Sequence, residues 1–164
     1  MIILGIDPGL ATMGWGVIET DGRRHRMLGY GTLETLAKTP MPSRLRALYS
    51  GVDQLIQTYA PEHIAFEELF FCRNVTTAMA VGAARGVALV AAAHHTQELY
   101  EYTPMQIKLA VAGYGKADKL QVQSMVRILL NLQEIPKPDD AADALALAIT
   151  HAHSMGMRQQ YRIQ

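Results

Sequence analysis

Apolar runs separated by turn signals mark the first part of the chain and predict three short strands. The opening run, residues 2–6, is apolar on both faces, which is typical of a strand at the centre of a sheet. It stops at the turn signal Asp7-Pro8-Gly9, and further strands are predicted over residues 14–19 and 27–33. Because Asp21-Gly22 is a hairpin signal, these strands are expected to form a meander.

The rest of the chain shows helical spacing of apolar residues, interrupted by two short strand-like runs. Helices are predicted over residues 42–59, 76–95, 119–132 and 139–153, with another beginning at Pro104, and strands over residues 64–67 and 99–102. A strand reached through a helix usually lies parallel to an earlier strand of the same sheet. The order therefore predicts a mixed five-stranded sheet flanked by helices, an α/β fold.

Length and composition agree with one globular unit. The chain has 164 residues, of which 49% are hydrophobic and 18% charged, so residues 1–164 are expected to form a single domain, with a frayed tail at about 157–164. No apolar run is long enough to span a membrane, and the first residues lack the features of a leader. We therefore expect a cytoplasmic protein without a membrane partner. The single cysteine, Cys72, excludes an internal disulfide.

The formal net charge is zero, which argues against a protein that is basic over its whole surface. Nucleic-acid binding stays possible, because the acids of a metal site would cancel a local basic patch in the sum. Phosphate contacts would then have to come from basic clusters at Arg23-Arg24-Arg26 or at Lys108, Lys116 and Lys119.

Acidic residues follow two of the predicted strands. Asp7 closes the first strand on the same face as Ile3 and Gly5, and Glu67, followed by Glu68, closes the fourth. In α/β sheets, polar sites gather at the carboxyl ends of parallel strands. Taken singly, Asp7 is as well explained by support of its own turn, and Glu67 by a solvated side chain.

A third acidic segment begins the last predicted helix. Asp140 and Asp143 are three residues apart and so lie on one face of its first turn. The alternative is helix capping, with Asp139 as N-cap and acids favoured by the helix dipole. Capping does not explain the small residues around Asp143, which suit a helix that lies close to a sheet. Such packing would bring the acidic end of the helix towards the strand ends.

Four acids gathered in this way suit hard divalent cations. Mg²⁺ takes oxygen ligands and is usually held by one or two carboxylates together with substrate phosphates. Two such ions can activate water and stabilise the leaving oxygen of a phosphoryl displacement. The residues alone therefore indicate a divalent-metal site, of a kind that suits phosphoryl transfer.

The segments LGIDPGLATMGWGVIE, IAFEELFF, ARGVALVAA and DDAADALALAITHAH, in this order, closely resemble the RuvC family of bacterial Holliday-junction resolvases. The resemblance covers nearly the whole chain and implies a ribonuclease H-like fold. It also implies a crossover junction endodeoxyribonuclease of DNA recombination and repair, which nicks two strands of a four-way DNA junction symmetrically. A homodimer that cooperates with the RuvA–RuvB branch-migration complex is implied as well.

The same resemblance assigns the catalytic and metal-binding acids to Asp7, Glu67, Asp140 and Asp143. Asp140 is selected over Asp139 because the family acid directly precedes Ala-Ala-Asp. Two Mg²⁺ ions per active site are implied, and Mn²⁺ is expected to substitute.

DNA contacts follow from the resemblance too. They fall on Phe70, Arg73, Arg85, Lys108 and Lys119. An aromatic side chain can stack on an unpaired base at a junction, and lysines can hold phosphate oxygens. Phe70 is equally well explained as a core residue, and a solvated helix face is the commoner place for any single lysine. The small-residue helix over 76–95 matches the family's dimer helix, although burial within its own domain would account for it equally.

Two other functions remain to be weighed. The strand-Asp-x-Gly opening also occurs in actin-like and sugar-kinase ATPases, but these need a second domain for which the chain has no room. The other is a non-catalytic junction-binding module on the same fold, and the presence of all four acids argues against it.

Overall fold

A computed structural model of the chain describes residues 1–69 and 75–164. Its described part holds a five-stranded sheet with strand order β3-β2-β1-β4-β5. The strands are β1 (Ile2–Asp7), β2 (Thr12–Thr20), β3 (His25–Glu34), β4 (His63–Glu67) and β5 (Leu99–Tyr102). β1, β2 and β3 pair antiparallel, whereas β4 pairs parallel with both β1 and β5. The predicted meander and the two parallel strands are confirmed.

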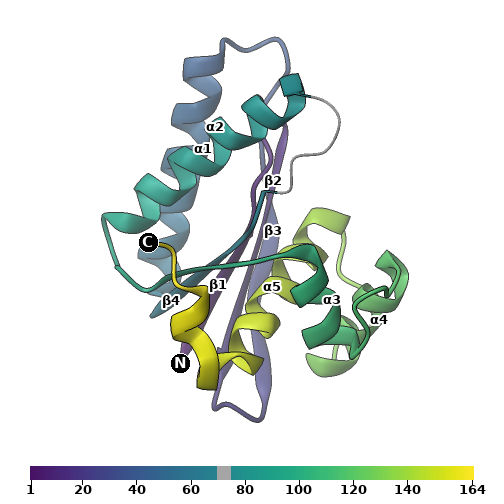
Figure 1. The fold of residues 1–164 in the computed structure, drawn as a ribbon. Helices are drawn as coiled ribbons and strands as arrows, with labels where there is room; N and C mark the ends of the chain where they lie inside the picture. Colours follow the sequence, from purple (N-terminus) through teal and green to yellow (C-terminus); the bar gives the residue numbers. More distant parts are fainter. Residues whose placement is uncertain (70–74) are drawn as a thin grey trace.

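Helices cover both faces of the sheet (Figure 1). They are α1 (Met41–Tyr59), α2 (Val75–Ala93), α3 (Pro104–Ala112), α4 (Lys119–Leu129) and α5 (Asp139–His153), followed by the 3-10 helix η1 (Met155–Tyr161). α1 and α2 pack on one face, and α5, with α3 and α4 beside it, packs on the other. No helix in the described part of the chain is both long and apolar enough to cross a membrane.

Alternation along β1 separates the two cores. Leu4 and Ile6 point into the core beneath α1 and α2, whereas Ile3 points into the core around α5. Since side chains alternate along a strand, Asp7 belongs to the same face as Ile3, the face that α5 covers. The sequence pattern thus aims Asp7 towards α5.

Glycines in β1 and β2 allow α5 to lie directly on the sheet. A β-carbon added to Gly5 would collide with the carbonyl oxygen of Ala144, and one added to Gly14 would collide with the carbonyl oxygen of Asp140. Gly16 gives Leu145 the same room. The alanines of α5 meet these glycines, so the helix backbone approaches the strands closely, as expected for its small-residue surface.

The start of α5 differs from the capping interpretation. Pro138 occupies the N-cap position, makes no side-chain cap hydrogen bond, and leaves Asp139 as the first helical residue. The alternative that Asp139 is the N-cap is therefore wrong.

The tail is also more ordered than expected. Instead of a frayed end at about 157–164, η1 continues to Tyr161, whose ring packs against Tyr102 with centroids 4.8 Å apart. Arg162 forms a bridge with Tyr100, and the Ile163 amide donates to the Leu99 carbonyl at 2.9 Å. The reason is that β5 is an edge strand, so its free backbone groups can pair with the tail.

Candidate active site

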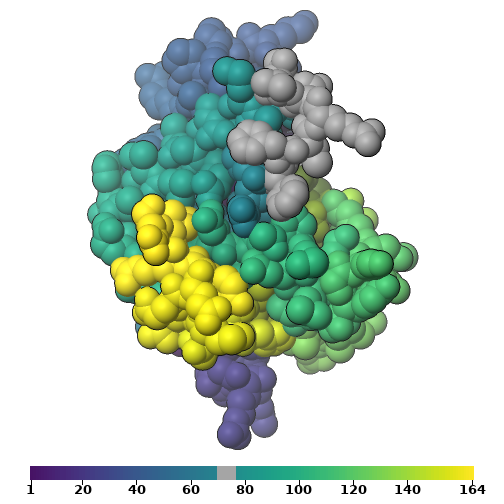
Figure 2. All heavy atoms as spheres, viewed as in Figure 1, coloured from purple at the N-terminus to yellow at the C-terminus, as the bar shows by residue number. Residues whose placement is uncertain are grey.

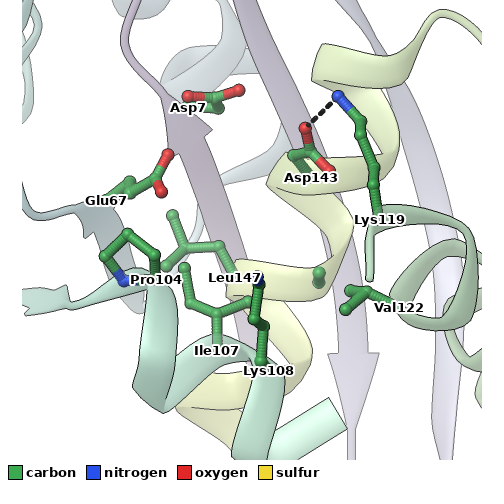
Figure 3. A pocket seen from close by; sticks show the side chains of 10 residues that line it. Asp7, Glu67, Pro104, Ile107, Lys108, Lys119, Val122, Asp143 and Leu147 are labelled. Atoms are coloured by element: carbon green, nitrogen blue, oxygen red, sulfur yellow. Dashed lines mark ion pairs between the residues drawn. The ribbon is translucent and has the colours of Figure 1, made fainter. Parts of the chain in front are cut away.

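A cavity of about 270 Å³ opens where the carboxyl ends of β1 and β4 meet the first turn of α5. Asp7, Glu67 and Asp143 line it, each from a different element, and so do Lys119 of α4, which lies beside Asp143, and Lys108 of α3 (Figure 3). Its remaining lining residues are apolar or small: Pro104, Ile107, Val122, Ala146 and Leu147. The cavity therefore brings three acids and two lysines together within an otherwise apolar lining.

Asp7 and Glu67 lie side by side because β1 and β4 are parallel neighbours that end together. Burial, followed by the charge of Glu67 and a hydrogen bond with it, raises the pKa of Asp7 to about 8. Burial raises the pKa of Glu67 as well, and the Asp143 charge adds to the effect. Two adjacent buried negative charges are unfavourable, so without a cation the pair favours a shared proton over full ionisation.

Asp143 faces this pair from α5 and interacts with a cation of the chain itself. The Lys119 ammonium lies 3.0 Å from an Asp143 carboxylate oxygen, an ion pair drawn in Figure 3. Burial nevertheless raises the pKa of Asp143, with Lys119 opposing the shift. One lysine thus only partly neutralises the acids around the cavity.

Asp139 and Asp140 occupy different surroundings. The charge of Asp140 contributes to the raised pKa of Asp7, so its carboxylate acts on the buried acids. Asp139 contacts Lys119 at 3.4 Å and Lys137 at 3.6 Å. Gln123 beside it and the Lys119 ammonium hold its pKa below the usual range. Asp139 is therefore matched by basic neighbours, whereas Asp140 adds to the negative charge around Asp7.

The acids form a donor set for a hard cation without a finished coordination shell. Among residues 1–69 and 75–164, no three His, Cys, Asp or Glu side chains are grouped as metal ligands. Asp7 and Glu67 share a hydrogen bond, and Asp143 forms an ion pair with Lys119. The chemistry still fits Mg²⁺ or Mn²⁺, because all the donors are carboxylate oxygens and the buried negative charge exceeds what Lys119 supplies.

The other candidate DNA contacts have mixed outcomes. Lys108 and Lys119 both reach the cavity. Arg85 does not point freely to solvent: it forms an ion pair with Glu101, and its side chain is 17% exposed. Phe70 and Arg73 lie outside the described residues. Arg85 is thus a weaker candidate for phosphate than either lysine.

The sequence interpretation missed residues that support the site without taking part in the reaction. Gly5 and Gly14 set how closely α5 approaches the strands, and so where Asp140 and Asp143 stand. The available signal was glycine at positions 5, 14 and 16 of strands that otherwise carry bulky residues. Glycine inside a strand often marks a close backbone approach.

Comparison with known proteins gives one consistent result. The family model for crossover junction endodeoxyribonuclease RuvC matches residues 3–151. A crossover junction endodeoxyribonuclease RuvC from Desulfitobacterium hafniense is 60% identical over 157 residues, which cover 96% of this chain and 95% of the relative. The protein of the same name from Alkaliphilus metalliredigens is 52% identical over 164 residues, the full length of both chains.

Solved structures agree with the sequence relatives. Thermus thermophilus RuvC in complex with a Holliday junction substrate superposes with a TM-score of 0.92 at 40% identity, over 96% of each chain. The yeast mitochondrial Holliday junction resolvase Ydc2 superposes with a TM-score of 0.69 at 14% identity, over 98% of this chain and 82% of that one. The second likeness concerns the fold alone, a ribonuclease H-like arrangement.

Proposed function

This chain belongs to the RuvC family of crossover junction endodeoxyribonucleases, enzymes that resolve Holliday junctions, and we propose that it cuts junction DNA with metal ions held by Asp7, Glu67, Asp140 and Asp143. One observation carries the assignment of the four acids. Besides burial, the influences that raise the pKa of Asp7 come from Glu67 of β4 and from Asp143 and Asp140 of α5, two segments distant from Asp7 in sequence. Acids that raise one another's pKa at a cavity are typical of a cation site.

The reaction is hydrolysis of a phosphodiester in the DNA backbone. Two Mg²⁺ ions, or Mn²⁺ in their place, would activate the attacking water and stabilise the charge that develops on the leaving oxygen. Asp7, Glu67, Asp140 and Asp143 would hold these ions through their carboxylate oxygens. A new bond from water oxygen to phosphorus forms as the bond to the 3′ oxygen breaks, leaving a 5′-phosphate and a 3′-hydroxyl.

The chain's own side chains position the substrate and move the proton. Lys108 and Lys119 stand across the cavity from Asp7 and Glu67, where their ammonium groups can hold phosphate oxygens. Engagement of a phosphate by Lys119 would release Asp143 from its ion pair. Asp143 or Asp140 is then free to accept the proton of the attacking water. Phe70, Arg73 and Arg85 are proposed as further DNA contacts.

Symmetric cutting of two strands calls for two active sites, and we propose that a homodimer supplies them. α2 packs one side against its own domain through alanines such as Ala84 and Ala88. Its other side leaves Met79 72% and Val90 52% exposed. Exposed apolar residues beside Gly86, where an added β-carbon would meet nothing within 4 Å, favour close contact with a second copy of α2.

The setting of the reaction follows the family. We propose that the enzyme works in the cytoplasm, in DNA recombination and repair, alongside the RuvA–RuvB branch-migration complex. The four-way junction, which RuvA–RuvB would move and this enzyme would cut, is the substrate common to both.

Cutting of a synthetic mobile four-way junction, compared with linear duplex of the same sequence, tests the proposal. With Mg²⁺ the junction should receive paired nicks at symmetric positions while the duplex stays intact, and EDTA should stop the reaction. The 5′-phosphate at each nick should allow ligation without further treatment. Equal cutting of junction and duplex would reduce the protein to a general nuclease, and binding without any nick would indicate a non-catalytic junction-binding module.

A further inference from the structure

Two histidines face each other at the end of the molecule furthest along α5 from the acids. His25 opens β3 at the tip of the β2–β3 hairpin, and His153 is the last residue of α5. Their Nε2 atoms lie 3.1 Å apart, and their ring centroids 5.1 Å apart. The hairpin tip projects from the body of the protein (Figure 2), so this pair joins a protruding element to the end of the central helix.

The outer nitrogen of His153 determines which tautomer its neutral ring adopts. His153 Nδ1 lies 3.0 Å from the backbone carbonyl oxygen of Ala110. A carbonyl oxygen can only accept a hydrogen bond, so Nδ1 carries the proton. In the neutral ring the Nε2 atom therefore presents a lone pair, and that lone pair is directed at His25.

The outer nitrogen of His25 leaves two states open. Its Nδ1 lies 2.8 Å from the hydroxyl oxygen of Thr20, a buried residue at the end of β2. A hydroxyl can donate or accept, so Thr20 supports either tautomer of His25. In one tautomer His25 donates its Nε2–H to His153. In the other the proton sits on Nδ1, Thr20 accepts it, and both Nε2 lone pairs converge.

The second state has the geometry of a metal site. Zinc binds imidazole nitrogen at about 2.0–2.1 Å in tetrahedral geometry, which requires two ligand nitrogens about 3.3 Å apart. The observed 3.1 Å separation needs an opening of only a few tenths of an ångström. Metal-binding histidines also usually donate their other ring N–H to a carbonyl or another oxygen, as Ala110 and Thr20 allow here.

Negative charge lies near the pair at the end of α5 and in the hairpin turn, beside the arginines Arg24 and Arg26 that flank His25 in sequence. His153 stands at the C-terminal end of α5, where the helix dipole places partial negative charge. The Asp21 carboxylate in the hairpin turn acts on His25 with the same sign, although burial and the neighbouring His153 together lower the pKa of His25 below its usual value. Neutral imidazole is the form that binds metal.

We propose that His25 and His153 bind one borderline divalent transition-metal ion per chain, Zn²⁺ or Ni²⁺, with water completing its shell. The site is separate from the carboxylates, because Asp143 and His153 are ten positions apart on α5, a rise of about 15 Å. Its chemistry differs as well: imidazole suits Zn²⁺ and Ni²⁺, whereas Mg²⁺ takes oxygen ligands. The bound ion fastens the hairpin to α5, and binding to the folded state alone raises the melting temperature.

The test is a Zn²⁺ titration against a chromophoric chelator, with saturating Mg²⁺ present to fill the carboxylate site. Every protein carries Cys72→Ser, so that the chain's one thiol does not contribute. His25→Gln and His153→Gln are compared with the parent, and His94→Gln, which loses only a surface bond to Tyr49, is the matched control. The parent should bind one Zn²⁺ per chain, with affinity reduced at least tenfold in both site variants and unchanged in the control. Equal Zn²⁺ affinity in all four proteins would overturn the proposal.

Nitrogen NMR on the unaltered histidines provides a second criterion that does not depend on the folding of any variant. Zn²⁺ should shift the Nε2 resonances of His25 and His153 and leave their Nδ1 nitrogens protonated. Ring resonances that stay in place during the titration would show that the pair is only a hydrogen bond between neutral imidazoles, and the proposal would fall.

Discussion

Helix α5 carries ionisable residues at both ends, and the two ends hold them in opposite ways. At its start, Asp143 and Asp140 join Asp7 and Glu67, and among the described residues the one ion pair that these four acids make is that of Asp143 with Lys119. Near its other end His151 is completely buried, yet both of its ring nitrogens are bonded, one to the Tyr102 hydroxyl at 2.8 Å and one to His63 at 2.8 Å.

Burial acts on both ends in the same direction, towards the neutral form. It raises the pKa of Asp7 to about 8 and lowers the pKa of His151 to about 3. The partners make the difference. His151 is neutral and has its hydrogen bonds, so it is complete as a structural residue, whereas the acids carry more negative charge than Lys119 offsets, and we propose that a cation compensates them. A perturbed pKa therefore points to a functional site only where the perturbed groups lack the hydrogen bonds or opposite charges that would compensate them.

The largest expected effect on junction cutting is that of Asp7→Asn, which tests whether the acids differ from His151 as described. Junction cutting should fall by about 10³-fold or more, because a residue proposed to hold the ions loses its charge. Gel-based cutting rates measure this loss, and junction affinity in EDTA should stay within about threefold, since binding rests on basic residues. Normal cutting by the variant would remove Asp7 from the site.

A smaller effect separates the neighbouring acids at the start of α5. Asp140→Asn should reduce cutting by about 10²-fold, because its charge acts on the buried acids. Asp139→Asn is the matched control and should change cutting by less than about threefold, since Asp139 is paired with Lys119 and Lys137 at the rim. The reverse order of the two effects would move the ligand to Asp139.

The close approach of α5 to the sheet can be broken at Gly5. Gly5→Ala places a methyl group against the Ala144 carbonyl and should lower the free energy of unfolding by about 1–3 kcal/mol. Urea denaturation measures the change, and cutting should fall with it as the acids of α5 are displaced. Gly156→Ala, where an added methyl meets nothing within 4 Å, should stay within about 0.5 kcal/mol of the parent. Equal stability of both variants would contradict the packing argument.

Stability should respond to pH in opposite directions at the two ends. The pKa of His151 in the folded protein lies below its unfolded value, so the unfolded chain binds more protons and stability is lost as pH falls below about 6.5. At pH 5 the loss from His151 is about 2 kcal/mol. His151→Phe should remove that slope, measured by urea denaturation across pH 5–7, while lowering stability at pH 7 through the unpaired Tyr102 hydroxyl. An unchanged slope would place the titrating group elsewhere.

The opposite sign holds for Asp7. Its folded pKa lies above its unfolded value, so without metal ions stability falls as pH rises from about 4 towards 8. In EDTA, Asp7→Asn should therefore be more stable than the parent at pH 8, with the difference shrinking towards pH 4. A variant less stable than the parent at pH 8 would mean that Asp7 is a structural residue like His151.

The sequence was enough to predict the placement of the acids near the start of α5, but not the contacts made by His151 near its other end. Asp7 and Glu67 were predictable because apolar runs show where strands end, and the order of elements makes β1 and β4 parallel neighbours. The His151–Tyr102 and His63 contacts were not, because they join residues 49 and 88 positions apart whose pairing depends on the packed geometry. For the same reason the glycine contacts with α5 and the pairing of the tail with β5 appear only once register is known.

Mn²⁺ binding measured by electron paramagnetic resonance, with an uncleavable junction present, tests the central claim most directly. The parent protein should bind Mn²⁺ at the acids, up to two ions per chain, and Asp7→Asn should lose this binding while still holding the junction. Equal number and affinity of bound Mn²⁺ in both proteins would contradict the claim that the acids at the strand ends and at the start of α5 form one metal site.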